Sequence, residues 1–256
     1  MLLAIDLGNT QTHLGMFRGD ELVEHWRLAT VLETTADELA TLLVDLLELR
    51  DLKLKDVDGA ILSSVVPQLT LEYERLSERY LQGGLTVVGP GLKTGMPIRI
   101  DNPHELGTDR LVNAVAAYAK VGAPCVVADF GTTINFDAVS GDGEYLGGVI
   151  APGVDISLEA LHQRTAKLPK VELSAPEQAI GRNTLAAVKS GVVFGFAGSV
   201  DGIVGRIREE LGDDATAIAT GGLAHAIVPY CEEIDEVDDL LTLTGLRLVW
   251  ERNEAG

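Results

Sequence analysis

Short apolar runs alternate with segments of helical spacing along the first third of the chain. Five of these runs predict strands, at residues 2–5, 12–17, 23–29, 60–66 and 85–88. Between the third and the fourth, Thr35 and Glu38 have the form of a capping box, and leucines recur at helical spacing behind them. A second helix is predicted at 69–81. The alternation of strands and helices predicts a layered α/β fold.

The same pattern begins again after the glycine- and proline-rich loop at 89–97. A helix predicted at 108–121 is followed by the strand 125–129, which leads into a second hairpin. Both halves of the chain place Asp-x-Gly-x-Thr where the first strand turns into its hairpin, as Asp6-Leu7-Gly8-Asn9-Thr10 and Asp129-Phe130-Gly131-Thr132-Thr133. We therefore expect two related lobes, residues 1–100 and 101–256.

A long helical stretch at 183–211 contains glycines at four-residue steps, Gly191/Gly195 and Gly198/Gly202. Each glycine costs a helix about 1 kcal/mol relative to alanine, and such steps permit the close approach of another helix. The pattern ends with a short strand at 216–219, the turn Thr220-Gly221-Gly222, a helix from about Leu223 and a final helix at 240–251.

The charge balance narrows the possible functions. Lys and Arg total 20 against 39 Asp and Glu, a formal net charge of −19, while the 46% of hydrophobic residues is typical of a globular protein. Such a field repels nucleic-acid backbones and anionic lipid, so we expect neither nucleic acid nor a membrane as a partner. An anionic ligand would need local neutralisation by a metal ion or by backbone amides.

Cysteines and apolar segments point to an ordinary cytoplasmic protein. Cys125 and Cys231 are too few for a disulfide framework, and neither has the surroundings of a catalytic thiol. The N-terminus has no basic flank before its apolar start. Asp201 and Arg206 interrupt the most apolar run, 190–207, which is predicted to be a buried helix. The five histidines are scattered without the spacing of a zinc site.

The two Asp-x-Gly-x-Thr turns are candidate phosphate-binding loops. A carboxylate at the end of a buried strand lies where open α/β sheets bind ligands. Gly8 and Gly131 would let the backbone approach a phosphate closely. One such turn alone is as well explained by an ordinary hairpin, and the second copy favours a pair of phosphate loops. A Walker A sequence, the alternative phosphate site, does not occur.

A second candidate site is the predicted start of the helix at 108–121. Thr108 has the position of an N-cap, which places Asp109 and Arg110 in the first turn. Asp109 at this point is also a common way of complementing the helix dipole, without any role in chemistry. The pair also suits the binding of a hydroxyl group and a neighbouring carboxylate.

In order and spacing, these segments together resemble the type III pantothenate kinases, members of the superfamily of acetate and sugar kinases, heat-shock chaperones and actin. The resemblance covers essentially the whole chain and rests on Asp6-x-Gly-Asn-Thr10, Asp101-Asn-Pro-x-Glu-x-Gly-x-Asp-Arg110, Asp129-x-Gly-Thr132, Gly147-Gly-x-Ile-x-Pro-Gly153, Ile180-Gly-x-Asn-Thr184 and Thr220-Gly-Gly222. It implies two actin-like (ribonuclease H-like) α/β lobes with a nucleotide cleft between them. It also implies a homodimer that uses ATP to phosphorylate the primary hydroxyl of pantothenate, the first step toward coenzyme A.

The resemblance further implies roles for individual residues. Asp109 would be the catalytic base, and pantothenate would be held by Gly107, Thr108, Asp109, Arg110 and Thr184. Asp6 would organise Mg²⁺, directly or through water, and Asp129 would bind a monovalent cation, K⁺ or NH₄⁺. ATP would be bound by Asp6, Leu7, Gly8, Asn9, Thr10, Gln11, Thr12, His13 and Thr132. For His13, a role in packing the turn is an equally good interpretation.

The chain departs from the family pattern at two places. Thr133 and Asn135 stand in the second turn, where a small residue and Thr or Val are expected. Ile100 stands where many relatives have an aromatic substrate contact. Neither change removes a charged group that the chemistry needs.

Two alternative functions stay open. One is a non-catalytic binding protein, since some relatives were described as accessory transcription factors. The other is a kinase of the same fold that acts on a different small alcohol or carboxylate, because the phosphate loops do not determine the substrate.

Overall fold

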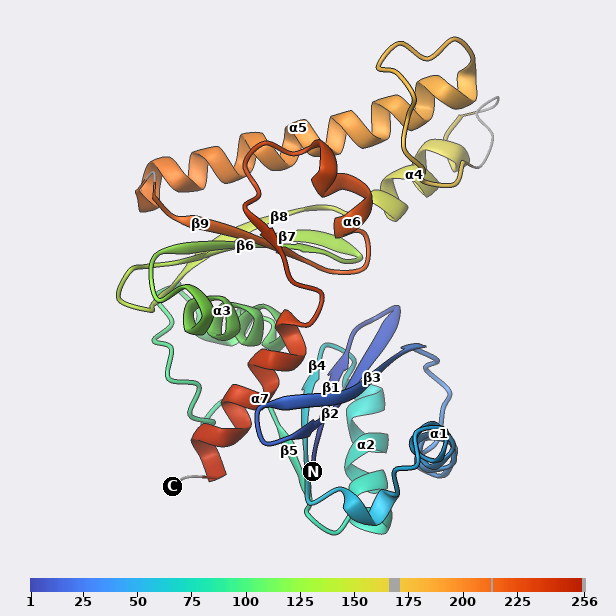
Figure 1. The fold of residues 1–256 in the computed structure, drawn as a ribbon, viewed down its shortest axis with the longest axis vertical. Helices are drawn as coiled ribbons and strands as arrows, with labels where there is room; N and C mark the ends of the chain where they lie inside the picture. The colour runs from blue at the N-terminus through green and yellow to red at the C-terminus, as the bar shows by residue number, and fades with distance from the viewer. Residues whose placement is uncertain (166–170, 213, 255–256) are drawn as a thin grey trace. The chain divides into compact units, whose positions relative to one another are not determined.

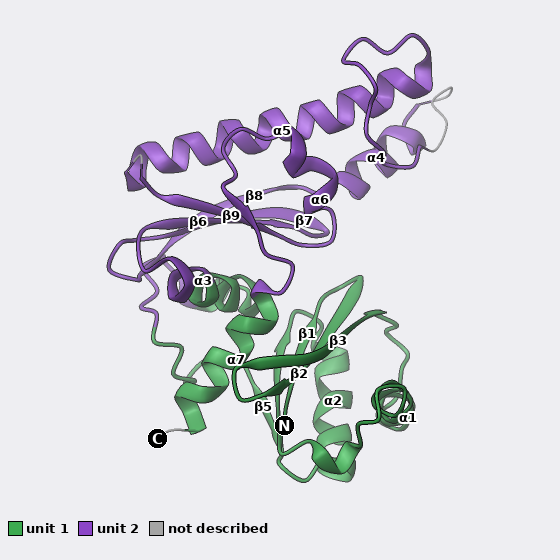
Figure 2. Cartoon of the chain, in the orientation of Figure 1, with its two compact units in different colours: residues 1–95, 104–116, 242–256 green, residues 96–103, 117–241 purple. Residues whose placement is uncertain are grey.

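The computed structural model describes residues 1–165, 171–212 and 214–254. The chain forms two compact units, drawn in green and purple in Figure 2. Unit 1 comprises Met1–Gly95, His104–Ala116 and Thr242–Gly256, and unit 2 comprises Met96–Pro103 and Ala117–Leu241.

Unit 1 is built on a five-stranded sheet with the order β3-β2-β1-β4-β5. Its strands are β1 (Leu2–Leu7), β2 (Gln11–Arg18), β3 (Glu21–Ala29), β4 (Gly59–Ser64) and β5 (Leu85–Val87). The first three are antiparallel neighbours, and β4 and β5 continue the sheet in parallel with β1. Apolar residues of β1, β2 and β4 pack against α1 (Ala36–Glu48) and α2 (Pro67–Tyr80) in one core. Figure 1 shows these two helices beside the sheet of unit 1.

Local sequence explains where α1 begins. The Thr35 hydroxyl accepts a hydrogen bond from the Glu38 amide, and the Glu38 carboxylate accepts one from the Thr35 amide, so the predicted capping box is confirmed. The charged hydrogen bonds from Thr35 lower the pKa of Glu38. Proline at the start of α2 fits the first turn of a helix, where its missing N–H costs nothing.

Unit 2 repeats this design with the strand order β10-β9-β6-β7-β8. Its strands are β6 (Cys125–Phe130), β7 (Thr133–Val139), β8 (Tyr145–Pro152), β9 (Thr216–Thr220) and β10 (Glu236–Val237). In both units three antiparallel strands follow each other along the chain, and two later strands extend the sheet in parallel with the first strand. The predicted internal repeat and the two-lobed α/β fold are therefore confirmed at the level of topology.

The helices of unit 2 are α4 (Val154–Gln163), α5 (Thr184–Leu211) and the short α6 (Ala224–Ile227). Residues of α5 pack with β6, β7 and β9 in a second core. Figure 1 shows α5 running along this sheet. By length and composition alone, α5 could cross a membrane, with a mean hydropathy of 1.3 over its most apolar stretch. One face of the helix is buried in the core of unit 2, through Ser190, Val193, Ala197, Val200, Val204 and Ile207, in agreement with the predicted buried helix.

The predicted division of the chain near residue 100 differs from the two units observed. Helix α3 (Thr108–Val121) has its first nine residues in unit 1, and α7 (Leu241–Glu254) joins unit 1 although it lies last in the sequence. Close packing explains this assignment. A side chain at Gly245 would lie 2.0 Å from the Val112 carbonyl oxygen, and one at Gly59 would lie 2.4 Å from the Trp250 ring.

Two strands and one α-helix of the described residues were not predicted from the sequence. Strand β8 contains Gly147 and Gly148 and ends at Pro152, so its composition is that of a loop. Helix α4 follows it immediately, and β10 has only two residues. The other predicted elements match observed ones to within a few residues at each end.

Candidate active site

The first phosphate turn follows directly from the end of β1. The Gly8 amide donates to the Gln11 carbonyl at 3.0 Å, which closes the turn. A side chain at Gly8 would lie 2.9 Å from that same oxygen, so only glycine fits here. The side chains of Asn9, Thr10 and Gln11 are exposed. The turn therefore presents backbone and side-chain polar groups to solvent, as a phosphate site requires.

The residues on either side of this turn are buried. Leu7 is 1% exposed and belongs to the core of unit 1, and Thr12 and His13 are also buried. The His13 Nε2 atom lies 3.0 Å from Nδ1 of His25, and the two rings meet edge to face. These contacts fit the interpretation of His13 as a residue that packs beneath the turn.

Strand register places Asp6 between two polar neighbours. Asp6 lies opposite His13 on β2 and beside Ser63 on β4. Directly paired residues of adjacent strands point to the same face of the sheet. Asp6 and Ser63 are therefore neighbours at the carboxyl ends of parallel strands, the edge where α/β sheets bind ligands.

Ser63 and Ser64 connect this edge to the start of α3. The Ser63 and Thr108 hydroxyl oxygens lie 2.9 Å apart, and the Ser64 amide donates to the Thr108 hydroxyl at 3.2 Å. The Thr108 hydroxyl thus binds β4, and Thr108 is already the first residue of the helix, so its prediction as an N-cap is wrong. These bonds bring the Gly107–Arg110 segment to the end of the sheet that carries Asp6.

Asp109 is held in a defined orientation at the start of α3. Its Oδ1 atom accepts a hydrogen bond from the Arg110 amide at 2.9 Å. A side chain at Gly107 would lie 2.5 Å from the same oxygen. Glycine at 107 therefore leaves room for the carboxylate, which is half-buried. The two serines of β4 were missed from the sequence, although two polar residues at a predicted strand end are a usable signal.

The second turn, in unit 2, is assembled from three separate segments. Asp129 lies beside Thr220 of β9, and Gly221 packs against it with φ +95°. A side chain at Gly221 would lie 2.6 Å from Asp129 Oδ1. Gly153 approaches from β8, where a side chain would lie 2.1 Å from the Thr132 carbonyl oxygen. The glycine motifs thus meet at Asp129 and Thr132.

The two residues of this turn that depart from the family pattern have hydrogen-bond partners within the turn region. The Thr133 hydroxyl donates to Asn135 Oδ1 at 3.1 Å, behind the turn. Asn135 lies opposite Asp129 in the β6–β7 ladder. The two unusual residues therefore bond to each other, and the Gly131 amide still closes the turn on the Thr133 carbonyl at 3.0 Å.

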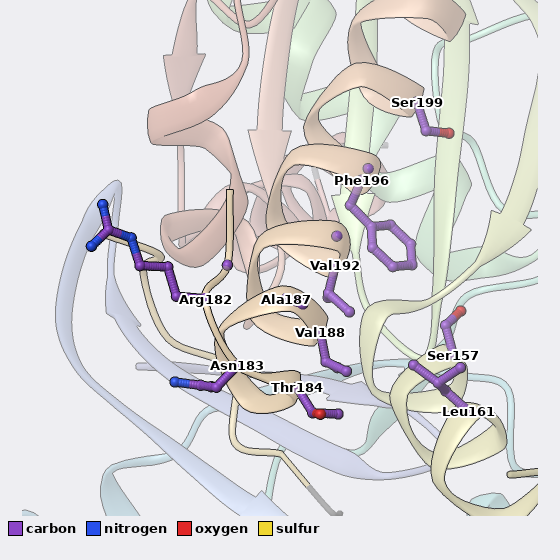
Figure 3. A pocket seen from close by; sticks show the side chains of 13 residues that line it. Ser157, Leu161, Arg182, Asn183, Thr184, Ala187, Val188, Val192, Phe196 and Ser199 are labelled. Atoms are coloured by element: carbon purple, nitrogen blue, oxygen red, sulfur yellow. The ribbon is translucent and has the colours of Figure 1, made fainter. Parts of the chain in front are cut away.

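Unit 2 also contains a pocket of about 890 Å³ between α4 and the first half of α5. Figure 3 shows Val188, Val192 and Phe196 of α5 on one side and Leu161 of α4 on the other. Thr184 lies at its edge, in the first turn of α5. The candidate substrate residue Thr184 thus belongs to unit 2, whereas Gly107–Arg110 belong to unit 1.

Local packing fixes the segment that leads into this pocket. The Asn183 Oδ1 atom accepts a hydrogen bond from the Ala186 amide at 2.8 Å and caps the helix. A side chain at Gly181 would lie 2.2 Å from the Ala187 amide nitrogen, so the chain can approach the helix this closely only at glycine.

The two thiols are unsuited to nucleophilic chemistry. Burial raises the pKa of Cys125 to about 12, and burial together with the Asp201 charge raises the pKa of Cys231 to about 12. Both are therefore protonated at neutral pH, when the thiol form is a poor nucleophile.

The polar residues at the two turns suit cations whose remaining ligands would come from a bound nucleotide and water. Among residues 1–165, 171–212 and 214–254, no group of three or more His, Cys, Asp or Glu side chains could hold a metal ion. One carboxylate beside a phosphate turn fits Mg²⁺, which at nucleotide sites takes one or two carboxylates together with phosphates and water. The oxygen atoms of Asp129 and the surrounding backbone suit a hard cation.

A family model for type III pantothenate kinases matches residues 2–206. The chain belongs to this family. A type III pantothenate kinase from Moorella thermoacetica is 51% identical over 253 residues, which cover 99% of this chain and all of the relative. One from Streptomyces avermitilis is 52% identical over 99% of this chain and 98% of its own length. One from Myxococcus xanthus is 49% identical, with both chains covered completely.

Solved structures support the fold of the kinase. A protein from Campylobacter jejuni described as a Baf family transcriptional activator has a TM-score of 0.62 at 18% identity, covering 99% of this chain and 100% of that one. Component A of (R)-2-hydroxyglutaryl-CoA dehydratase from Acidaminococcus fermentans has a TM-score of 0.54 at 15% identity, covering 100% and 99%. At these identities the likeness concerns architecture, and it agrees with the two repeated sheets of the kinase.

Proposed function

We propose that this type III pantothenate kinase transfers the γ-phosphoryl group of ATP to the primary hydroxyl of pantothenate, in the first step toward coenzyme A. The observation that carries the proposal is the Ser63–Thr108 hydrogen bond of 2.9 Å. It anchors the Gly107–Arg110 segment at the end of the sheet where Asp6 and the first phosphate turn lie. The residues proposed to bind the acceptor hydroxyl and those proposed to bind the phosphates therefore lie at the same end of the unit 1 sheet.

ATP would be bound mainly by backbone amides of the Gly8–Gln11 turn, with a further contact from Thr132. In a protein of net charge −19, the turn contains no lysine or arginine. Backbone amides and cations then provide the positive field that phosphoryl transfer needs. Asp6 would hold Mg²⁺, which neutralises charge on the phosphates when bound. Asp129 would hold K⁺ or NH₄⁺.

Asp109 acts as the base. The pantothenate hydroxyl oxygen attacks the γ-phosphorus as the bond to the β–γ bridging oxygen breaks, and ADP leaves. An alcohol is too weak an acid to lose its proton first, so Asp109 orients the hydroxyl and accepts the proton late in the reaction. Its hydrogen bond from the Arg110 amide keeps the carboxylate in place. The Arg110 side chain would pair with the carboxylate of pantothenate.

The active form would be a homodimer that uses the exposed face of α5. Side chains added at Gly191, Gly195 and Gly198 would meet nothing within 4 Å. The Phe194 ring on the same helix is 37% exposed. An apolar helix face lined by small residues, beside a pocket edged by Thr184, suits a second copy of the chain better than water. We place the enzyme in the cytoplasm.

The direct test measures ADP release by the purified protein with Mg-ATP and pantothenate, with K⁺ present or replaced by Na⁺. We expect turnover that requires pantothenate and is stimulated by K⁺. Turnover with other small alcohols but not with pantothenate would support the alternative of a related kinase. Absence of turnover with every acceptor would contradict a kinase function altogether.

A further inference from the structure

Thr30, the residue that follows β3, binds the first phosphate turn twice. Its amide donates to the Thr10 carbonyl at 2.9 Å, and its hydroxyl donates to the Gly8 carbonyl at 2.8 Å. The first bond continues the β2–β3 ladder, as any residue at this point would do. The second requires a hydroxyl side chain, so it is specific to the residue type.

These two bonds determine where the amides of the turn point. In a trans peptide the carbonyl oxygen and the following N–H point in opposite directions. With the Gly8 and Thr10 oxygens held toward Thr30, the N–H groups of Asn9 and Gln11 point away from it. Since Asn9 and Gln11 are exposed, these donors face the side from which an anion can approach.

The Thr30 hydroxyl is itself supported by the hydroxyl group of Thr12. The Thr12 and Thr30 hydroxyl oxygens lie 3.0 Å apart. Each hydroxyl has one hydrogen, and that of Thr30 is used on Gly8, so Thr12 is the donor to Thr30.

Burial favours this arrangement. Thr12 is 3% exposed, so water competes little for its hydrogen bond to Thr30. Two hydroxyl groups, those of Thr12 and Thr30, thus donate in sequence to the Gly8 carbonyl.

We propose that Thr30 is a positioning residue for nucleotide binding, which uses the Thr12–Thr30 pair of hydroxyl groups to preset the amides of the Gly8–Gln11 turn for the phosphates of ATP. The proposal rests on the proposed role of this turn in binding ATP. The hydrogen bonds of Thr30 go to Gly8, Thr10 and Thr12, so its effect should fall on ATP rather than on pantothenate.

Thr30→Val keeps the shape and removes the hydroxyl, and Thr30→Ser restores it. We expect Thr30→Val to raise the KM for ATP and the Kd for ADP, measured by calorimetry, by about tenfold, the scale of one net hydrogen bond. The KM for pantothenate stays unchanged, and Thr30→Ser recovers most of the affinity. Thr12→Val, which removes the hydroxyl that donates to Thr30, raises both ATP and ADP constants by about threefold.

The matched control is Thr41→Val on α1, where the hydroxyl donates to the Asp37 carbonyl at 2.9 Å, away from the turn. It should leave all constants as in the wild type. Unchanged ADP affinity in Thr30→Val, or failure of Thr30→Ser to restore it, overturns the proposal. So does an equal rise in the KM for both substrates, which would indicate general loosening. If Thr30→Val does not fold, Thr12→Val decides by the same criteria.

The proposed function fails in a different way. Wild-type protein that binds ADP but shows no turnover with pantothenate contradicts the reaction, and the calorimetric comparison of variants still tests Thr30. Wild-type protein that does not bind ADP contradicts both.

Discussion

In unit 1 the turn after β1 is held by side-chain hydroxyls, whereas in unit 2 the turn after β6 is held by backbone packed at glycines. Thr30 reaches the first turn through its hydroxyl, and Ser63 anchors the neighbouring helix start in the same way. Around the second turn, Gly153 and Gly221 leave space that no other residue could leave. The same strand order therefore supports two turns by different chemistry.

This difference affects how each turn responds to mutation. A hydroxyl contributes one hydrogen bond, and its removal weakens a site by a limited amount. A glycine with a positive φ and backbone within contact distance cannot be replaced without moving the chain. Loss of a hydroxyl beside the first turn should therefore weaken the site by a limited amount, whereas a single substitution at Gly153 or Gly221 should disrupt the second turn.

The largest effect is expected at the carboxylate of the reaction itself. Asp109→Asn should lower kcat by about 10²–10⁴-fold, the usual contribution of a general base, with little change in the KM for ATP. Steady-state ADP release checks this. Asp155→Asn in the first turn of α4 is the matched control, because Asp155 is an exposed acidic residue at another helix start. A decrease below threefold would show that Asp109 only complements the helix dipole.

Gly221 provides the sharpest test of the difference between the two turns. Gly221→Ala should abolish stimulation by K⁺ and lower the free energy of unfolding by at least about 2 kcal/mol, since both the φ of +95° and the contact with Asp129 oppose a side chain. Gly122→Ala is the control, because Gly122 has φ +65° with open space around it. It should show only the backbone cost, about 1 kcal/mol in urea unfolding. Normal K⁺ stimulation in Gly221→Ala would contradict the assignment of Asp129.

Substitutions on the exposed face of α5 should stabilise the single chain but weaken the dimer. Gly195→Ala with Gly198→Ala should stabilise the isolated chain, since alanine favours a helix over glycine by about 1 kcal/mol. In a tightly packed dimer the same change should raise the dimer Kd by about tenfold, through the overpacking cost of added methyl groups. Analytical ultracentrifugation measures the Kd. Glu210→Ala, exposed on α5 away from the glycines, is the control. An unaffected dimer would place the interface elsewhere.

A smaller effect is expected for the anchor between β4 and α3. Ser63→Ala should raise the KM for pantothenate by about three- to tenfold, because one hydrogen bond to Thr108 is lost while the rest of the helix start remains attached. The KM for ATP should change less. Ser77→Ala, another buried serine of unit 1, is the control. If the two variants behave alike, Ser63 contributes only to packing.

The last prediction concerns stability at high pH rather than activity. Burial raises the pKa of Cys125 to about 12 from a reference value of 9.0, so above pH 9 the unfolded chain loses this proton while the folded chain keeps it. Its contribution is thus complete below pH 9 and is lost as the pH rises toward 12, by about 1.4 kcal/mol per pH unit. Urea unfolding of wild type and Cys125→Ala between pH 8 and 11 measures this. Parallel pH profiles would contradict it.

The parts of the candidate site that depend on short motifs could be predicted from the sequence. Asp6, Asp109 and Asp129 could be named from strand ends and a helix start, and the repeated Asp-x-Gly-x-Thr located the two turns. Their residue roles stay proposals. Thr30 and Ser63 could not be found in this way, because their contacts join residues 22 and 45 positions apart. A lone hydroxyl at the end of a strand has no distinctive pattern.

Prediction of the fold from the sequence has the same limit. Strands and helices with regular spacing were predicted, but β8 was not, since its paired glycines suppress the β signal. The membership of α7 in unit 1 depends on close packing at Gly59 and Gly245 with partners more than a hundred residues away. Such long-range contacts are invisible to local pattern.

The position of α7 has a consequence for synthesis on the ribosome. Unit 1 contains the first 95 residues, yet it is completed only by Thr242 and the residues after it, whereas the sheet of unit 2 ends at Val237. Although domains generally fold in the order in which they are made, the first half of this chain must wait for residues made after the second. Until then, the surface at Gly15 and Gly59 that α7 covers is exposed in the growing chain.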